Sequence, residues 1–141
     1  MTTKPKKVYL APSVLFAFLD RSHAKNNQAS AFFRYFAQEN YQLYTDIVSL
    51  YEVYRQIYND MSPTIAKELL RTMSMSNITL VYPDERDMNA ALKVYVNDRS
   101  SDLTFQTALM AVLADKKGIT QVCTFDYFHS LFGLSVFYIP I

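Results

Sequence analysis

The chain is poor in glycine, cysteine and histidine, and each shortage excludes a class of site. The 141 residues contain two glycines, Gly118 and Gly133, so no glycine-rich loop is left for a P-loop or a dinucleotide-binding fingerprint. A single cysteine cannot form an internal disulfide, and Cys123 lies in an apolar run, which predicts a packed thiol in a reducing compartment. The two histidines, His23 and His129, are too few and too far apart to predict a zinc site.

A strong net charge and a long apolar run are also missing. The net charge of +1 means that any nucleic-acid site must come from a local arrangement of side chains rather than from an overall basic field. No stretch of about 18 apolar residues occurs, and the polar start MTTKPKK precedes too short an apolar stretch for a signal peptide. We therefore expect a cytoplasmic protein with no membrane span. Because no linker is visible, we expect residues 1–141 to form a single domain.

Short apolar runs alternate with helical patterns along the chain. Strands are predicted at residues 8–10, 42–44, 78–81, 122–123 and 135–139. Helices are predicted over residues 14–19, 25–38, 47–57, 63–74, 84–95 and 104–117, with a short one at 127–132. Asp46 and Asp84 are expected to start their helices. This alternation implies a three-layer α/β fold, with a mostly parallel central sheet covered by helices on both sides.

The stretch over residues 104–139 is the most informative part of the sequence. Apolar residues recur at helical spacing up to Gly118, which stands where a left-handed helix cap belongs. The apolar run at 122–123 is too short for a helix and predicts a buried strand, which delivers Thr124 and Asp126 to its C-terminal edge. In an open α/β sheet, that edge is where ligands bind.

Four segments carry a family resemblance: VYLAPSVLFAFL, YTDIVSLYEVYRQI, DLTFQTALMAVLADKKGI and VCTFDYFHSLFGLSVF. Together they resemble the PIN domain family over nearly the whole chain. Members of this family are small α/β proteins that mostly act as metal-dependent ribonucleases, and they include the VapC-type toxins of toxin–antitoxin modules. The resemblance implies a PIN-like fold and a site with four acidic positions.

Two of the four acidic positions of the family are filled here. The resemblance assigns the glutamate of the third helix to Glu52 and the aspartate after the fourth strand to Asp126, with Ser13 and Thr124 as neighbouring hydroxyls. The competing interpretation of Glu52 is a buried acid paired with Arg55 or with a lysine elsewhere in the chain. The hydroxyls have competing roles as well, because Ser13 would serve as a helix cap and Thr124 as a strand end.

The other two acidic positions are occupied by Ala11 and Gln106. The alanine side chain has no atom that can bind a metal ion, and the glutamine amide oxygen carries no full charge. Asp102 is the candidate substitute ligand, although helix capping or solvent exposure is its competing role. The resemblance thus gives Glu52, Asp126, Thr124, Ser13 and Gln106 as catalytic residues, and Glu52, Asp126 and Asp102 as metal ligands.

The missing acids lead to two functional hypotheses. In the first, the chain is a degenerate PIN-domain protein that binds RNA or a protein partner, has weak or absent nuclease activity, and binds metal in the millimolar range or not at all. In the second, it is an active endoribonuclease, a VapC-like toxin that uses Mg²⁺ or Mn²⁺ to activate a water molecule. An antitoxin-like protein is then an expected partner.

The sequence has no tryptophan, but its eleven tyrosines and ten phenylalanines exceed what a core of this size needs. Two groups lie at helical spacing: Tyr51, Tyr54 and Tyr58, and Phe32, Tyr35 and Phe36. The first interpretation of these rings is core packing. The second is a hydrophobic groove or a homodimer interface, which also receives an antitoxin helix in the toxins that the chain resembles. The third is stacking of single-stranded RNA bases.

Overall fold

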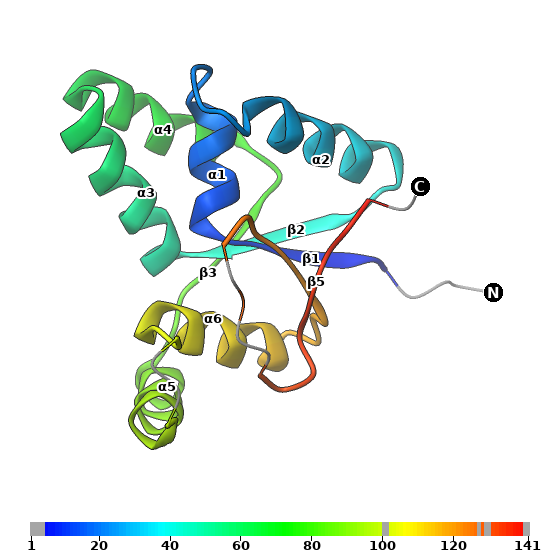
Figure 1. Cartoon of the computed structure of the whole chain (residues 1–141), viewed down its shortest axis with the longest axis vertical. Coiled ribbons are helices and arrows are strands. Elements are labelled where there is room, and N and C mark those ends of the chain that lie inside the picture. The colour runs from blue at the N-terminus through cyan, green and yellow to red at the C-terminus, as the bar shows by residue number, and fades with distance from the viewer. Residues whose placement is uncertain (1–4, 100–101, 127, 129–130, 140–141) are drawn as a thin grey trace.

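The computed structural model describes residues 5–99, 102–126, 128 and 131–139 of the chain. They contain one five-stranded sheet in the order β3-β2-β1-β4-β5, and all four strand pairs are parallel. The strands are β1 (Lys7–Leu10), β2 (Gln42–Asp46), β3 (Thr79–Val81), β4 (Gln121–Cys123) and β5 (Ser135–Val136). Helices lie on both sides of the sheet (Figure 1), which confirms the predicted three-layer α/β fold.

Six of the seven predicted helices are present. They are α1 (Pro12–Leu19), α2 (Asn26–Gln38), α3 (Ile47–Asp60), α4 (Pro63–Met75), α5 (Glu85–Asn97) and α6 (Phe105–Lys116). The seventh, predicted at 127–132, falls partly on residues outside the described part of the chain, and Phe132 and Gly133 form a turn with positive φ angles of 55° and 74°. The last strand ends at Val136 rather than at Ile139, so it is shorter than predicted.

Alternation along β1 divides the core between the two faces of the sheet. Val8 and Leu10 pack with residues of α1 to α4, whereas Tyr9 packs with residues of α5 and α6. In Figure 1 the sheet accordingly separates α1–α4 from the α5 and α6 pair. Cys123 belongs to the first cluster, and burial raises the pKa of its thiol to about 12. The predicted packed, unreactive thiol is therefore confirmed.

Side chains at the helix starts fix where four of the helices begin. Asp46, Ser62, Asp84 and Thr104 each accept a hydrogen bond from a backbone N–H in the first turn of α3, α4, α5 and α6. The expected helix-start roles of Asp46 and Asp84 are thus confirmed. Helix α1 differs, because Ala11 precedes it and offers no side-chain cap.

The aromatic residues of α2 belong mainly to the core. Phe36 is buried, and its ring centroid lies 4.9 Å from that of Phe137 and 5.1 Å from that of Tyr41. On α3 the arrangement differs, because Tyr51 and Tyr58 are 60% and 47% exposed. Core packing is therefore confirmed for α2, whereas on α3 Tyr51 and Tyr58 form part of the surface and Tyr54 is partly buried against the core. Among the residues that the structure describes, no helix has the length and apolarity that crossing a bilayer requires.

An ion pair joins the start of α5 to the end of α6. The Lys116 ammonium lies 3.0 Å from the nearer carboxylate oxygen of Asp87, and Asp87 also accepts a hydrogen bond of 3.0 Å from the Asp84 N–H. Burial of Asp87 opposes its ionisation, but the hydrogen bonds from Asp84 and Lys116 outweigh it and hold the pKa of Asp87 below its ordinary value. The ionised form of Asp87 therefore stabilises the fold.

We predict that Asp87→Ala lowers the free energy of unfolding by about 1 kcal/mol at pH 7. Because the native pKa of Asp87 is depressed, this contribution is fully present above the ordinary carboxyl pKa of about 4 and is lost as the pH falls below it. Urea unfolding between pH 7 and pH 3 measures the effect. Glu85→Ala, in the same helical turn, is the control and should change little. A difference between Asp87→Ala and the native chain that does not shrink in acid would contradict the assignment.

Candidate functional site

The site lies at the C-terminal end of β1, the strand at which the strand order of the sheet reverses. Strands β2 and β3 extend the sheet on one side of β1, and β4 and β5 extend it on the other. Ligands of open α/β sheets bind outside the carboxyl ends of the strands at such a point. Here the chain leaves β1 into α1 and leaves β4 into the segment Thr124–Asp126. Both exits contribute hydroxyl groups, from Ser13 and Thr124.

These hydroxyl groups hold the segment after β4 in place. The Ser13 Oγ and Thr124 Oγ1 atoms lie 3.2 Å apart, and the Phe125 N–H donates to Ser13 Oγ at 3.0 Å. The Asp126 N–H donates to Thr124 Oγ1 at 3.1 Å. The two side chains thus position Asp126 at the end of β4. The competing role of Ser13 as the cap of α1 is wrong, because the residue before α1 is Ala11.

A pocket of about 560 Å³ opens beside this segment, between α1, α3 and the connection from α1 to α2. Ser13, Glu52 and Asp126 are among its lining residues, so the structure brings these three predicted site residues together. Both acidic residues are exposed. The competing interpretation of Glu52 as a buried acid is therefore wrong.

Gln106 does not line this pocket, because its side chain is engaged elsewhere. Its amide donates a hydrogen bond of 3.0 Å to the Ser49 hydroxyl, which donates in turn to the Asp46 carboxylate at 2.9 Å. The Tyr9 hydroxyl donates to the same carboxylate at 2.5 Å. Burial, followed by the charge of Asp46, raises the pKa of Tyr9, so the phenol stays protonated. Gln106 thereby joins a buried hydrogen-bond network under the first turn of α3.

The metal ligands predicted from the resemblance are not all brought together. Asp102 is exposed in the loop before α6 and does not line the pocket. Within the described part of the chain, no three His, Cys, Asp or Glu side chains gather closely enough to hold one metal ion. A divalent ion such as Mg²⁺ prefers several oxygen ligands in octahedral geometry. Because Mg²⁺ commonly takes only one or two of these oxygens from carboxylates and the rest from water, Glu52 and Asp126 alone would hold such an ion weakly.

Sequence reasoning missed the cationic side of the pocket. Its two cations are Lys25 and Arg55, and His23 is a further lining residue. Arg55 follows Glu52 by three residues, about one helical turn, and this spacing was the available signal. Lys25 and His23 carried no signal, because their place depends on how the connection between α1 and α2 folds.

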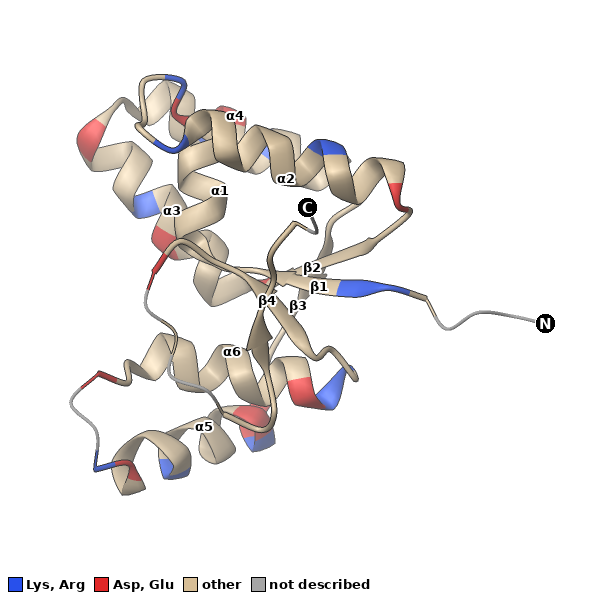
Figure 2. Cartoon of the chain, turned by 45° about the vertical axis from the view of Figure 1, so that its right-hand side comes forward, with Lys and Arg blue, Asp and Glu red and all other residues tan. Residues whose placement is uncertain are grey.

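Hydrogen bonds within that connection fix its shape. The Asp20 carboxylate accepts from the Ser22 hydroxyl at 2.7 Å and from the Ser22 N–H at 3.0 Å. The hydroxyl bond, followed by the backbone bond, lowers the pKa of Asp20. The Lys25 N–H donates to His23 Nδ1 at 3.0 Å, so a neutral His23 carries its proton on Nε2. Cations and carboxylates are interspersed over the rest of the molecule (Figure 2).

Two solved structures share this arrangement of elements. The Mycobacterium tuberculosis VapC20, a sarcin–ricin loop cleaving toxin, is 18% identical, with a TM-score of 0.75 over 84% of this chain and 89% of the toxin chain. The FitAcB structure from Neisseria gonorrhoeae is 13% identical, with a TM-score of 0.64 over 84% of this chain and 87% of the other. The chain has a PIN-like fold. At these identities the likeness shows the fold and assigns no residue roles.

No protein-family model and no curated protein matches the sequence. The likeness of the fold to the two solved structures is thus what confirms the PIN resemblance of the four segments. The places of Glu52 and Asp126 at the pocket rest on the geometry of this chain. Their catalytic and metal-binding roles, and those of Ser13, Thr124, Gln106 and Asp102, stay predictions.

We predict that Ser13→Ala lowers the free energy of unfolding by about 1 kcal/mol, because the Phe125 N–H loses its acceptor. Amide hydrogen exchange at Phe125 and Asp126 should become faster than in the native chain. Ser74→Ala is the matched control, since the Ser74 hydroxyl bonds the Arg71 carbonyl within its own helix. Unchanged exchange at both amides would show that Ser13 does not hold this segment.

Proposed function

We propose that this PIN-like protein binds single-stranded RNA at the pocket between α1 and α3, with weak or absent nuclease activity. The proposal is supported mainly by the presence of both cationic and acidic side chains in the pocket wall. Lys25 and Arg55 share it with Glu52 and Asp126. Lysine and arginine bind phosphate oxygens, whereas carboxylates repel them unless a metal ion lies between. A wall that holds both signs of charge favours RNA binding over tight metal binding.

A count of charges supports this proposal. The lining includes three carboxylates, of Glu52, Asp60 and Asp126, and two permanent cations, of Lys25 and Arg55. The sum is therefore one negative charge, where a site with four carboxylates and no cation would carry four. A phosphate meets correspondingly less repulsion here. Neutral donors such as the Ser13 hydroxyl and the His23 Nε2–H add hydrogen-bonding groups for its oxygens.

The same count argues for weak binding of Mg²⁺ or Mn²⁺. Each carboxylate that Ala11 and Gln106 replace removes an interaction worth roughly 1 to 4 kcal/mol with a divalent ion. Two such losses lower the affinity by several powers of ten. The two cations of the pocket oppose a third positive charge. We therefore propose millimolar affinity for these ions, or none.

We predict that Lys25→Ala and Arg55→Ala each weaken the binding of a short single-stranded RNA about fivefold. Each should also reduce the slope of log affinity against log salt concentration by about 0.7, because one phosphate contact is lost. Fluorescence anisotropy of labelled RNA in the presence of EDTA measures both quantities. EDTA removes any contribution from divalent ions.

Lys67→Ala is the matched control for these two variants. It removes one positive charge from an exposed position on α4 that lies outside the pocket lining. We expect the affinity and the salt slope of this variant to stay near the native values. If Lys67→Ala weakens binding as much as Lys25→Ala does, the attraction is a general effect of charge and the pocket is not the RNA site.

The alternative function is an active divalent-metal-dependent endoribonuclease, as in a VapC-like toxin. The fold likeness to a toxin that cleaves the sarcin–ricin loop favours it. In that function Glu52 and Asp126 would bind the ion and orient a water molecule that the ion activates. Cleavage of single-stranded RNA that requires Mn²⁺ and disappears in Asp126→Asn would establish this alternative and overturn the weak-nuclease proposal.

We predict that the double variant Ala11→Asp, Gln106→Asp binds Mn²⁺ at least about tenfold more tightly than the native chain. Ala11 is 3% exposed at the start of α1, so a carboxylate there would be buried and would need a cation beside it, which this variant tests. Isothermal calorimetry measures the affinity. Adding Asp126→Asn to the double variant should cancel the gain. An unchanged affinity in the double variant would show that these two positions do not face the site.

The antitoxin-like partner and the homodimer expected from the sequence stay predictions. The surface that favours them lies on α3, α4 and the turn between them, where large apolar and aromatic side chains are exposed. They include Tyr51, Tyr58, Met61, Ile65, Leu70 and Met75. Tyrosine and methionine are enriched in the centres of protein interfaces. This surface is distinct from the RNA pocket, so both forms of binding are compatible in one molecule.

A further inference from the structure

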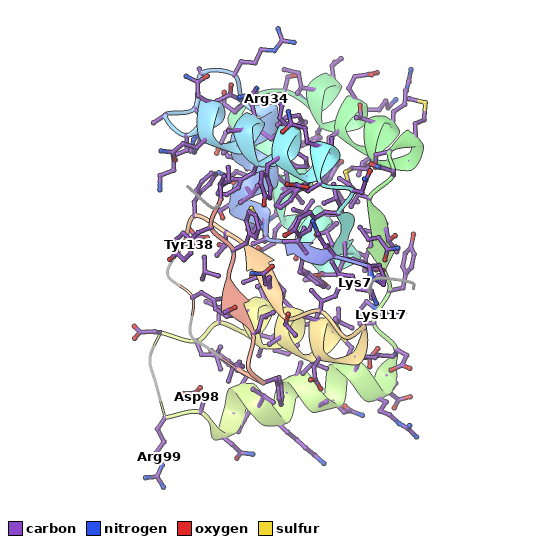
Figure 3. All side chains as sticks on the ribbon, turned by 90° about the vertical axis from the view of Figure 1, so that its right-hand side faces the viewer. Lys7, Arg34, Asp98, Arg99, Lys117 and Tyr138 are labelled. Carbon is purple, nitrogen blue, oxygen red and sulfur yellow. The ribbon has the colours of Figure 1, made fainter. Side chains whose placement is uncertain are left out.

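A second pocket, of about 290 Å³, adjoins the first. Its wall is formed by Gln28, Ala31 and Phe32 of α2, by Phe125, and by Tyr138 and Ile139 after β5. Phe125 also lines the first pocket, so one aromatic ring lies at the boundary between the two. Figure 3 shows Tyr138 at the edge of the molecule, below α2.

The chemistry of this second pocket differs from that of the first. The ring centroids of Phe32 and Phe125 lie 5.7 Å apart, and Tyr138 is 75% exposed, so much of its ring faces solvent. Gln28 and the Tyr138 hydroxyl add polar groups to a wall that is otherwise apolar. An unstacked nucleobase has the complementary form, because its faces stack on aromatic rings while its edge pairs with an amide or hydroxyl.

A cation lies at the boundary between the pockets. The Lys25 ammonium is 5.0 Å from the centroid of the Phe125 ring. Phosphate and base alternate along a nucleic-acid strand, and sites for single strands combine cations that follow the backbone with rings that stack the bases. The Lys25 ammonium, the Phe125 ring and the second pocket follow one another in space. This order matches a phosphate group followed by the base next to it.

We propose that this second pocket binds one unpaired base of the single-stranded RNA whose phosphate contacts Lys25. The proposal rests on the proposed RNA binding at the first pocket and adds a base-binding subsite to it. The alternative occupant is an apolar side chain of a protein partner. A partner helix requires a groove that takes several side chains at successive turns, whereas this pocket is small and continuous with a wall of charged residues.

The test compares a six-nucleotide single-stranded RNA with an abasic oligomer of the same length, which keeps every phosphate and lacks every base. Fluorescence anisotropy in EDTA gives both affinities. On the native chain, we expect the intact RNA to bind about tenfold more tightly, which is the gain from stacking one base. This ratio separates base binding from phosphate binding, since the charges of the two oligomers are equal.

Two variants locate the base. Tyr138→Ala removes an exposed part of the wall, and Ala31→Leu fills the pocket from α2. The affinity of each variant for the intact RNA should fall to the affinity of the native chain for the abasic oligomer. The affinity of each variant for the abasic oligomer should equal that of the native chain. Tyr82→Ala is the matched control, because Tyr82 is 67% exposed and lines neither pocket. It should keep the native ratio.

The outcomes distinguish this inference from the proposed function. If the native chain binds neither oligomer, the proposed RNA binding is wrong, and the proposed base subsite is then wrong as well. If it binds both equally, or if the pocket variants keep the native ratio, RNA binding stands and the base subsite is wrong. Tyr138→Ala is sufficient for this decision if Ala31→Leu fails to fold, because an exposed side chain contributes little to folding.

Discussion

The site depends on the hydrogen bonds that join the ends of β1 and β4. The Ala11 N–H donates to the Cys123 carbonyl at 3.0 Å, one residue beyond the paired strands. Ser13 then accepts from the Phe125 N–H and contacts the Thr124 hydroxyl. These bonds bring two segments more than 100 residues apart in the chain to one edge of the sheet. Without them Asp126 would not be held opposite α3.

The charges at this edge decide what the site can do. Glu52 and Asp126 share a pocket with Lys25 and Arg55. A divalent ion needs concentrated negative charge, whereas a phosphate needs donors and cations. The pocket wall offers groups for both, with the carboxylates of Glu52, Asp60 and Asp126 and the cations of Lys25 and Arg55. Ser13 and Thr124 hold the segment after β4 in place, and both a nuclease and a binding protein would need this segment held. Their hydroxyl groups alone therefore do not distinguish the two functions.

The sequence predicted what depends on neighbouring residues. Asp84 was assigned to a helix start, and the structure places it in a capping box with Asp87. The strand before Thr124 was predicted from a short apolar run bounded by polar residues, and it is present as β4. Glu52 and Asp126 were assigned by resemblance, and their meeting at one pocket depends on the order of the strands, which no local pattern encodes.

Other features depend on contacts between distant segments, and the sequence did not predict them. The Gln106 amide bonds the Ser49 hydroxyl in the first turn of α3, a contact that no local pattern indicates. Lys25 reaches the pocket because hydrogen bonds of Asp20 and His23 shape the connection before α2. The last strand was predicted to be longer than it is, because Phe137 and Ile139 pack into the core without continuing the strand.

Ala11 and Gln106 each suit this fold for a physical reason. Ala11 is 3% exposed and packs in the core cluster between the sheet and α6, where a small apolar side chain is well accommodated. Gln106 gains a neutral hydrogen bond to Ser49, so its polar group is satisfied. Neither residue leaves a buried charge or an unpaired donor. A fold shared with a toxin does not fix the charges of the site, so the activity must be argued from the pocket itself.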